Sequence, residues 1–492
     1  MMFGLAKKFD GGLKLPPNKH GAEAPSRILP IPESLTYYLT KNIKETHQCI
    51  VNIGETVLFG QSIARGLGHQ PDIHAAYGGV IEAIGSKAGP YDAPEEQAVI
   101  IRTSEYKNVY KHDDKIKNKS DLLKSMGVAG MGGAAFPTGE KVQAAGAPRV
   151  WLINGVECEP MLSCDQCLMR EQADKLVQAI RYLAAEIMPG RVILALESDK
   201  ADAVSAMRLA LGDVTDIELA CLPPRYPQGG EKQLIQTLLG LEVPSGTHAA
   251  HLGILVLNVA TVMAAFDALA YHLPLTHRLV TVAGQGVSAP GNVWVPIGAA
   301  LKDVLDFCGY DGAATLRVTV GGPMMGRAVN SLDVAVTKGT SAILALTAAD
   351  ELAVYSAQPC IRCGVCTEVC PARLQPEDMY FNIRAGRLNR TRETGLMDCI
   401  ACGACAYVCP SEIPLVASFL YAQQICRIED EQKARAAYIG DLVKARDARL
   451  AARRSVRMGK SASREAAART VDPAAMEKVD AAREKARSKI DK

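Results

Sequence analysis

Eight of the fifteen cysteines in this chain occur in two short runs with the same spacing. Residues 360–371 read CIRCGVCTEVCP, and residues 399–410 read CIACGACAYVCP. Both runs are Cys-x2-Cys-x2-Cys-x3-Cys-Pro, the spacing that holds cubane iron–sulfur clusters in bacterial ferredoxins, where the fourth cysteine of each run binds the other cluster. The spacing predicts two [4Fe–4S] clusters. Their ligands are Cys360, Cys363, Cys366 and Cys409 for cluster 1, and Cys399, Cys402, Cys405 and Cys370 for cluster 2.

The alternatives for these runs are a zinc site or no metal, which two complete copies of the pattern disfavour. The segment between the runs contains PEDMYFNIRAGRLNR, whose apolar positions have helical spacing, and it predicts a helical two-cluster domain. Cys158, Cys164 and Cys167 form a second, incomplete group, for which packing and a metal site both stay open. Two neighbouring clusters carry single electrons and do no chemistry on a substrate themselves.

The composition indicates a protein of several domains with a packed core. The chain has 492 residues, of which 48% are hydrophobic and 22% charged, and its net charge of +2 argues against a nucleic-acid binder. No signal peptide is visible, and the most apolar window, from Gly253, is interrupted by Asn258 and Asp267. We therefore expect a soluble, cytoplasmic protein that reaches a membrane only through a partner or through its basic C-terminal segment.

Patterns of strands, helices and turns divide the chain into segments. Short strands dominate residues 35–103, where IHAAYGGVIEAIG predicts a hairpin that bends at Gly78 and Gly79. Strand and helix alternate after it, with a helix predicted over residues 170–188, as in an α/β parallel sheet. We predict an extended arm (1–34), a barrel-sandwich hybrid domain (35–115), an α/β domain (116–275), a small β-rich domain (276–350), a two-cluster domain (351–426) and a basic tail, helical or disordered (427–492).

Four segments of the α/β domain place polar groups beside turns. They are VAGMGGAAFPTGEKV (128–142), NGVECEP (154–160), YPQGGEKQL (226–234) and LNVAT (257–261). The first does not fit a Walker loop, because Lys141 does not directly follow a glycine and no Ser or Thr follows it. Ligands of open α/β sheets bind beyond the carboxyl ends of strands, and glycines let the backbone approach a phosphate or a ring. We expect the four segments to converge on one ligand.

Together these segments resemble the flavin-binding subunit of respiratory complex I, whose loop ends in the same style as Phe136 to Lys141. The order GGLKLPPNK, FPTGEK, ECEP, YPQGGEKQL and GGPMMG, followed by the cysteine runs, is more similar still to the RnfC family, whose members are subunits of Rnf electron transport complexes. The resemblance covers about residues 11–426. It implies a multidomain α/β and β fold, with a barrel-sandwich hybrid, a Rossmann-like FMN/NADH domain, a β-grasp-like (SLBB) domain and a helical two-cluster ferredoxin domain.

The resemblance also implies a set of ligand-binding residues. FMN would be held by Gly130, Gly132, Gly133, Lys141, Asn154, Glu157, Tyr226, Gly230, Asn258 and Thr261. NAD(H) would be contacted by Phe136, Glu159 and Glu231. Complex I has an arginine where Met131 stands and an acid where Val156 stands, so contacts with the ligand differ there. No side chain is assigned as a catalytic acid or base.

The implied activity is that of the NADH-binding subunit of a ferredoxin:NAD oxidoreductase that translocates Na⁺ or H⁺. A flavin can accept two electrons as hydride and release them singly, so it belongs between nicotinamide and clusters. The implied partners are the iron–sulfur protein RnfB and the membrane subunits, with ferredoxin indirectly, at the cytoplasmic face of the bacterial inner membrane. Two alternatives stay open: an iron–sulfur relay subunit without flavin, and the NADH-oxidising subunit of a soluble flavin dehydrogenase.

The C-terminal segment is the most basic part of the chain. From Arg427 onward, 18 Lys and Arg face 11 Asp and Glu, a net charge of +7. Such a segment is either a solvated helix or a contact for a membrane surface or partner.

Overall fold

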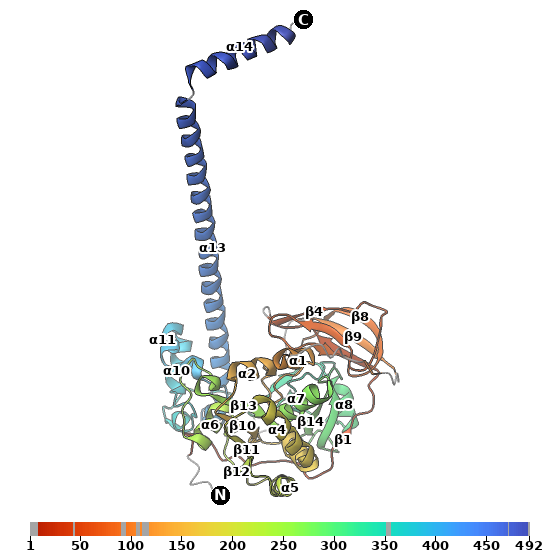
Figure 1. Ribbon diagram of the computed structural model, residues 1–492. Helices are drawn as coiled ribbons and strands as arrows, with labels where there is room; N and C mark the ends of the chain where they lie inside the picture. The colour runs from red at the N-terminus through yellow and green to blue at the C-terminus, as the bar shows by residue number, and fades with distance from the viewer. Residues whose placement is uncertain are drawn as a thin grey trace. The chain divides into compact units, whose positions relative to one another are not determined.

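The computed structural model describes residues 8–42, 45–89, 95–104, 109–110, 118–350, 356–470 and 472–490. The chain forms two compact units, Met1–Leu420 and Tyr421–Lys492. Figure 1 shows the course of the chain through both.

Two four-stranded sheets form the first domain of the larger unit. Their orders are β2-β9-β8-β5 and β3-β4-β6-β7. The strands are β2 (Ser34–Tyr38), β3 (Thr40–Asn42), β4 (Glu45–Cys49), β5 (Thr56–Val57), β6 (Ser62–Gly66), β7 (Ile73–His74), β8 (Gly79–Lys87) and β9 (Glu96–Thr103). The hairpin predicted at Gly78 and Gly79 is wrong: β7 pairs with β6, whereas β8 pairs with β5 and β9. The glycines lie where the chain passes from one sheet to the other.

The second domain is built on a parallel sheet with the order β12-β11-β10-β13. Its strands are β10 (Val150–Gly155), β11 (Val192–Glu197), β12 (Glu218–Leu222) and β13 (Ile254–Asn258). Alternate residues of these strands enter two separate cores, such as Trp151 on one face and Leu152 on the other. This burial of both faces is typical of parallel sheets and confirms the predicted α/β arrangement.

Helices supply the other half of both cores. They are α1 (Lys119–Ser125), α2 (Thr138–Ala145), α3 (Cys164–Glu171), α4 (Ala173–Ile187), α5 (Ala201–Leu211), α6 (Glu231–Leu239) and α7 (Val259–Tyr271), with a 3-10 turn at Ala249–Leu252. The helix predicted over residues 170–188 is α4, which begins later because α3 precedes it with a break at Gln172.

A six-stranded sheet forms the β-rich domain, with the order β1-β15-β14-β18-β16-β17. Its elements are β1 (Arg27–Ile28), β14 (His277–Ala283), β15 (Gly291–Pro296), α8 (Leu301–Phe307), β16 (Arg317–Val320), β17 (Arg327–Val329) and β18 (Ala342–Leu346). The N-terminal arm contributes β1. One core joins this sheet to the barrel-sandwich strands, since Leu35 and Ile63 pack in the same cluster as Val280 and Val293.

The cysteine-rich segment is helical, as predicted. Its helices are α9 (Val365–Glu368), α10 (Pro376–Arg384), α11 (Leu388–Glu393) and α12 (Ala404–Tyr407), with a 3-10 turn at Leu396–Asp398. Equivalent glycines, Gly364 and Gly403, precede α9 and α12 in the left-handed conformation, with φ of 80° each.

The C-terminal unit is helical. It consists of most of α13 (Leu415–Arg469) and of α14 (Pro473–Ile490), and α13 is one continuous helix (Figure 1). Most of its described side chains are exposed, including Tyr438 and Leu442. Among the described residues, no helix is both long and apolar enough to span a bilayer.

Candidate flavin site and cluster cavities

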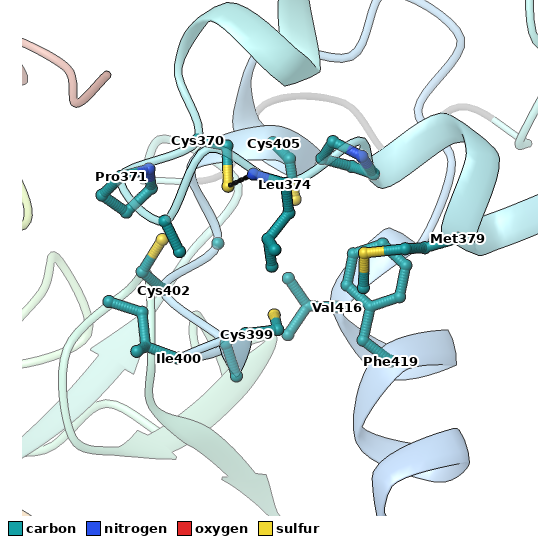
Figure 2. Close-up of a pocket in the computed structure, with 14 residues that line it drawn as sticks. Cys370, Pro371, Leu374, Met379, Cys399, Ile400, Cys402, Cys405, Val416 and Phe419 are labelled. Atoms are coloured by element: carbon teal, nitrogen blue, oxygen red, sulfur yellow. Dashed lines mark hydrogen bonds between the residues drawn. The ribbon is translucent and has the colours of Figure 1, made fainter. Parts of the chain in front are cut away.

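One cavity collects the four cysteines that were predicted to hold cluster 2. Cys370, Cys399, Cys402 and Cys405 line it, together with apolar side chains that include Ile400, Leu374 and Phe419. Figure 2 shows the four sulfur atoms turned toward a common space. Cys370 belongs to the first run and the other three to the second, so the structure brings the crossing set together. Cys402 and Cys405 are buried.

A second cavity collects the cysteines predicted for cluster 1. Cys360, Cys363, Cys366 and Cys409 line it, with Glu377 and Tyr380 beside them. This cavity lies nearer to solvent, since Cys363 is exposed and Ile361 keeps 68% of its surface accessible.

The chemistry of both cavities fits iron–sulfur clusters. Burial raises the pKa of Cys399 and of Cys405, and raises that of Cys402 to about 11. Without iron these groups are neutral thiols, so that binding of iron displaces their protons. Backbone N–H groups donate to the sulfur atoms of Cys370 (from Leu374, 3.3 Å) and Cys360 (from Arg362, 3.4 Å). Such bonds tune the potential of a cluster.

The remaining cysteines of the incomplete group are distributed differently. The Cys158 sulfur accepts a hydrogen bond from the Gly229 N–H (3.2 Å), whereas Cys164 and Cys167 are buried in α3. The ligands of a four-iron cluster lie farther apart than those of a single ion, and within the described part of the chain no three His, Cys, Asp or Glu side chains are close enough to bind one metal ion. The incomplete group therefore does not form a single-ion site there.

The glycine loop, residues 127–137, joins α1 to α2. The Gly130 N–H bonds the Phe136 carbonyl (2.7 Å), and the Met131 N–H bonds the buried Thr261 hydroxyl (2.8 Å). In contrast, the N–H groups of residues 132–134 make no hydrogen bond with the described protein. Gly133 has a φ of 103°, and a side chain there would meet open space. The loop therefore offers unused donors, which suit a phosphate group.

Two asparagines lie side by side beneath this loop. Asn154 of β10 and Asn258 of β13 are register partners at the carboxyl ends of adjacent strands. From β10 the chain continues outward to β11 and β12 and then returns to β13 on the other side of β10, so the strand order reverses between β10 and β13. Ligands of α/β sheets bind at such a switch point. The side-chain amide oxygen of Asn258 caps α7, and its side-chain NH2 group donates a hydrogen bond to the Asp165 carboxylate (2.6 Å). The loop crosses it closely, because a Cβ on Gly132 would lie 3.5 Å from the Asn258 Cβ.

Several predicted ligand-binding residues are engaged with other protein groups. The Glu157 carboxylate accepts the N–H groups of Asp165 and Gln166 at the start of α3 and lies 3.6 Å from the Lys19 ammonium. The Lys141 ammonium, predicted to bind a phosphate, forms an ion pair with Glu231 and donates to the Val256 carbonyl (3.2 Å). Phe136 is 49% exposed. Gly230 caps the start of α6.

Tyr226 and Glu159 lie at the boundary with the cluster 2 loop. The buried Tyr226 hydroxyl donates to the Cys402 carbonyl (2.5 Å), and Tyr226, Cys402 and Ala404 share a small apolar core. The Glu159 carboxylate accepts the N–H groups of Met324 (2.8 Å) and Met325 (3.0 Å), and burial raises its pKa. The structure therefore links these two residues to the cluster and β-rich domains, a placement that the sequence segments did not indicate.

Asp165 is a site residue that sequence reasoning missed. Burial, and after it the charge of Glu157, raises its pKa to about 7, while the hydrogen bond from Asn258 opposes that shift. The only signal in the sequence was its position after the ECEP segment, and one acidic residue in a helical stretch is not distinctive.

The comparisons with known proteins agree with this layout. Residues 7–105 match the RnfC barrel sandwich hybrid domain, 123–267 the Nuo51 FMN-binding domain, 279–328 the SLBB domain and 356–413 the 4Fe-4S dicluster domain. These matches, with the two cysteine cavities, define a flavin- and iron–sulfur-containing electron-transfer protein whose cofactors are FMN and two [4Fe–4S] clusters.

Relatives narrow this class to one family, RnfC, the C subunits of ion-translocating oxidoreductase complexes. The Pectobacterium carotovorum protein of this name is 37% identical over 459 residues, covering 91% of this chain and 61% of that protein. The Yersinia pestis protein of the same name is 37% identical over 453 residues, covering 90% and 73%. The chain belongs to this RnfC family, and it spans less than two thirds of the Pectobacterium protein. A NAD⁺-reducing [NiFe]-hydrogenase structure is 20% identical, with a TM-score of 0.43 over 58% of this chain and 59% of that chain.

Proposed function

We propose that this chain passes electrons between NADH and the rest of a membrane-bound ferredoxin:NAD oxidoreductase that translocates Na⁺ or H⁺. The observation that supports this most directly is the contact of Tyr226, in the flavin-binding domain, with Cys402 of the cluster 2 loop. FMN, when bound, exchanges hydride with nicotinamide and single electrons with the clusters. The residues of this chain bind and orient the two ligands.

The proposed order of carriers is flavin site, cluster 2 and cluster 1. Cluster 2 has Cys370, Cys399, Cys402 and Cys405 as its proposed ligands, and its loop packs against the flavin-binding domain. Cluster 1, with Cys360, Cys363, Cys366 and Cys409, lies where Cys363 is exposed. An exposed cluster at the far end suits exchange with a partner.

The FMN site is proposed at the switch point between β10 and β13. The unused N–H groups of residues 132–134 and the paired Asn154 and Asn258 support it. The strand order, with its reversal beside β10, supports a Rossmann-like domain, and we propose a β-grasp-like fold for the β-rich domain. Phe136, at the exposed end of the loop, is a proposed wall for NADH. The half-buried Glu159 requires a rearrangement to contact NADH, because its carboxylate accepts the N–H groups of Met324 and Met325.

The proposed partners are the iron–sulfur protein RnfB and the membrane subunits, at the cytoplasmic face of the bacterial inner membrane. The relatives are named as subunits of an ion-translocating oxidoreductase complex, and this supports an assembly of the same kind.

Anaerobic reduction of the isolated protein by NADH tests the proposal. We expect flavin bleaching in the optical spectrum, followed by EPR signals of reduced clusters. Bleaching without any cluster reduction would refute the path, and a protein with clusters that takes up no FMN would favour the relay subunit without flavin. Complete activity without detergent or membrane partners would favour a soluble flavin dehydrogenase.

A further inference from the structure

A buried arginine of the β-rich domain reaches the glycine loop. Arg278, on β14, has only 1% of its surface accessible. Its guanidinium donates to the Met131 carbonyl (3.3 Å), in the middle of the loop, and to the Lys338 carbonyl. The Met131 N–H is meanwhile held by Thr261 (2.8 Å). Both polar groups of this peptide position are therefore fixed, and one of the two partners comes from another domain.

A lysine of the same domain holds the start of the loop. The Lys338 ammonium donates to the Gly127 carbonyl (2.8 Å) and to the Asp72 carbonyl of the barrel-sandwich domain (2.7 Å). The junction is tight, because a Cβ on Gly127 would lie 2.9 Å from the Lys338 nitrogen. The next residue, Gly339, packs against the loop as well, since its Cβ would lie 3.2 Å from the Gly133 carbonyl oxygen.

Through these contacts the β-rich domain supplies the positive charge near the glycine loop. The lysine that follows the loop in sequence, Lys141, is neutralised by Glu231. Arg278 binds neutral carbonyl groups through the contacts described above and adds a positive potential at the loop. Lys338 acts through its hydrogen bonds to carbonyl groups, because burial lowers its pKa to about 7. The N–H groups of residues 132–134 stay unused among the described contacts.

We propose that Arg278 and Lys338 are positioning residues for the phosphate of FMN, which hold the carbonyl groups of the glycine loop and leave its N–H groups to the phosphate. The preference for FMN over riboflavin, which has the same ring system without the phosphate, then depends on a domain that lies outside the flavin-binding domain in sequence. This inference rests on the proposed flavin site.

Flavin titrations of the full chain test the inference. After removal of bound flavin, FMN and riboflavin are titrated separately, with flavin fluorescence as the signal. The variants are Lys338→Met, Arg278→Met and Arg278→Lys, and the control is Lys302→Met, which removes an exposed cation of the same domain. We expect the two methionine variants to lose about tenfold in FMN affinity with little change for riboflavin. Arg278→Lys should recover part of the loss, and the control should match the wild type.

The outcomes separate the inference from the proposed function. A wild-type chain that binds neither flavin contradicts the flavin site itself. The inference is overturned if the wild type prefers FMN and both methionine variants keep that preference. It is also overturned if the variants lose affinity for FMN and riboflavin equally, which would indicate a general loosening of the fold. If Arg278→Met does not fold, Lys338→Met alone decides, because methionine fills a similar volume without the amino group that holds the Gly127 carbonyl.

Discussion

Replacing Tyr226 with phenylalanine tests whether cluster 2 is the carrier next to the flavin-binding domain. The change removes one oxygen atom and keeps the ring, which packs with Cys402 and Ala404 in a buried apolar core. Burial raises the pKa of Tyr226, so the hydroxyl stays protonated and donates to the Cys402 carbonyl at 2.5 Å. The substitution therefore removes the hydrogen bond beside one proposed cluster ligand, and with it the interaction of the Tyr226 hydroxyl with the Glu159 carboxylate, which opposes the rise that burial causes in the pKa of Glu159.

The size of the effect follows from the burial of that bond. Loss of a hydrogen bond that leaves a buried carbonyl without its donor costs about 1–2 kcal/mol of stability. A donor near a cluster also favours its reduced, more negative form. A net hydrogen-bond energy is about 1 kcal/mol. If half or all of that energy is gained only when the cluster is reduced, its loss lowers the one-electron potential of cluster 2 by about 20–40 mV.

An EPR-monitored redox titration measures this shift, and cluster 1 provides an internal reference in the same sample. Tyr182→Phe is the matched control, because its hydroxyl also bonds a backbone carbonyl, that of Leu269 (3.3 Å), within the α/β domain. We expect Tyr226→Phe to lower one potential only and Tyr182→Phe to lower neither. Unchanged potentials in Tyr226→Phe, or equal shifts of both clusters, would refute the placement of cluster 2 beside Tyr226.

Three further predictions concern the clusters and the domain junction. Cys370→Ala should remove cluster 2 and Cys409→Ala should remove cluster 1, each lowering the iron content by about half. EPR identifies the cluster that remains. Loss of cluster 1 in Cys370→Ala, or of cluster 2 in Cys409→Ala, would contradict the crossing of the fourth ligands. Gly403→Ala should lower the free energy of unfolding by about 1–2 kcal/mol more than Gly364→Ala does. Both glycines have a φ of 80°, but only at Gly403 would the added Cβ lie 2.8 Å from a backbone oxygen. Equal melting temperatures of the two variants would show that this contact relaxes. Burial lowers the pKa of Lys338 to about 7, whereas a lysine of the unfolded chain has a pKa of about 10.4. Between these two pH values the unfolded chain holds a proton that the folded protein has already lost, so the free energy of unfolding rises by about 1 kcal/mol per pH unit. Denaturant titrations at several pH values should show this slope in the wild type and should not show it in Lys338→Met.

The cluster domain was predictable because its signal is local. The spacing of the cysteines indicated both ligand sets, and the structure places each set around one cavity, including the crossing of Cys370 and Cys409. The alternation of strands and helices was equally readable, because parallel strands buried on both faces appear as continuous apolar runs. The start of the helix predicted at residue 170 was misplaced because α3 and α4 follow each other with only Gln172 between them.

Contacts between segments far apart in sequence could not be predicted in the same way. The false hairpin at Gly78 and Gly79 arose because a glycine pair marks a turn but does not say which strands pair after it. Arg278 was invisible for a similar reason: an arginine in a strand normally faces solvent, and only the packing of the β-rich domain against the glycine loop buries it. Lys141 ends a glycine-rich segment and was assigned to FMN from the resemblance, yet Glu231 of another helix forms an ion pair with it.

The two cluster sites differ in how far the surrounding protein encloses them, and this difference bears on their reduction potentials. The site of cluster 2 is enclosed: the arm supplies Gly11, whose Cβ would lie 2.5 Å from the Cys370 carbonyl oxygen, and the β-rich domain approaches Gly403. The site of cluster 1 borders solvent at Cys363. Because exposure and hydrogen bonds to sulfur both set cluster potentials, the two clusters should not be equivalent, although their sequence runs are nearly identical. The asymmetry comes from segments that pack around cluster 2 alone: the arm contacts Cys370 of the first run, and the β-rich domain and Tyr226 of the flavin-binding domain contact the second run at Gly403 and Cys402.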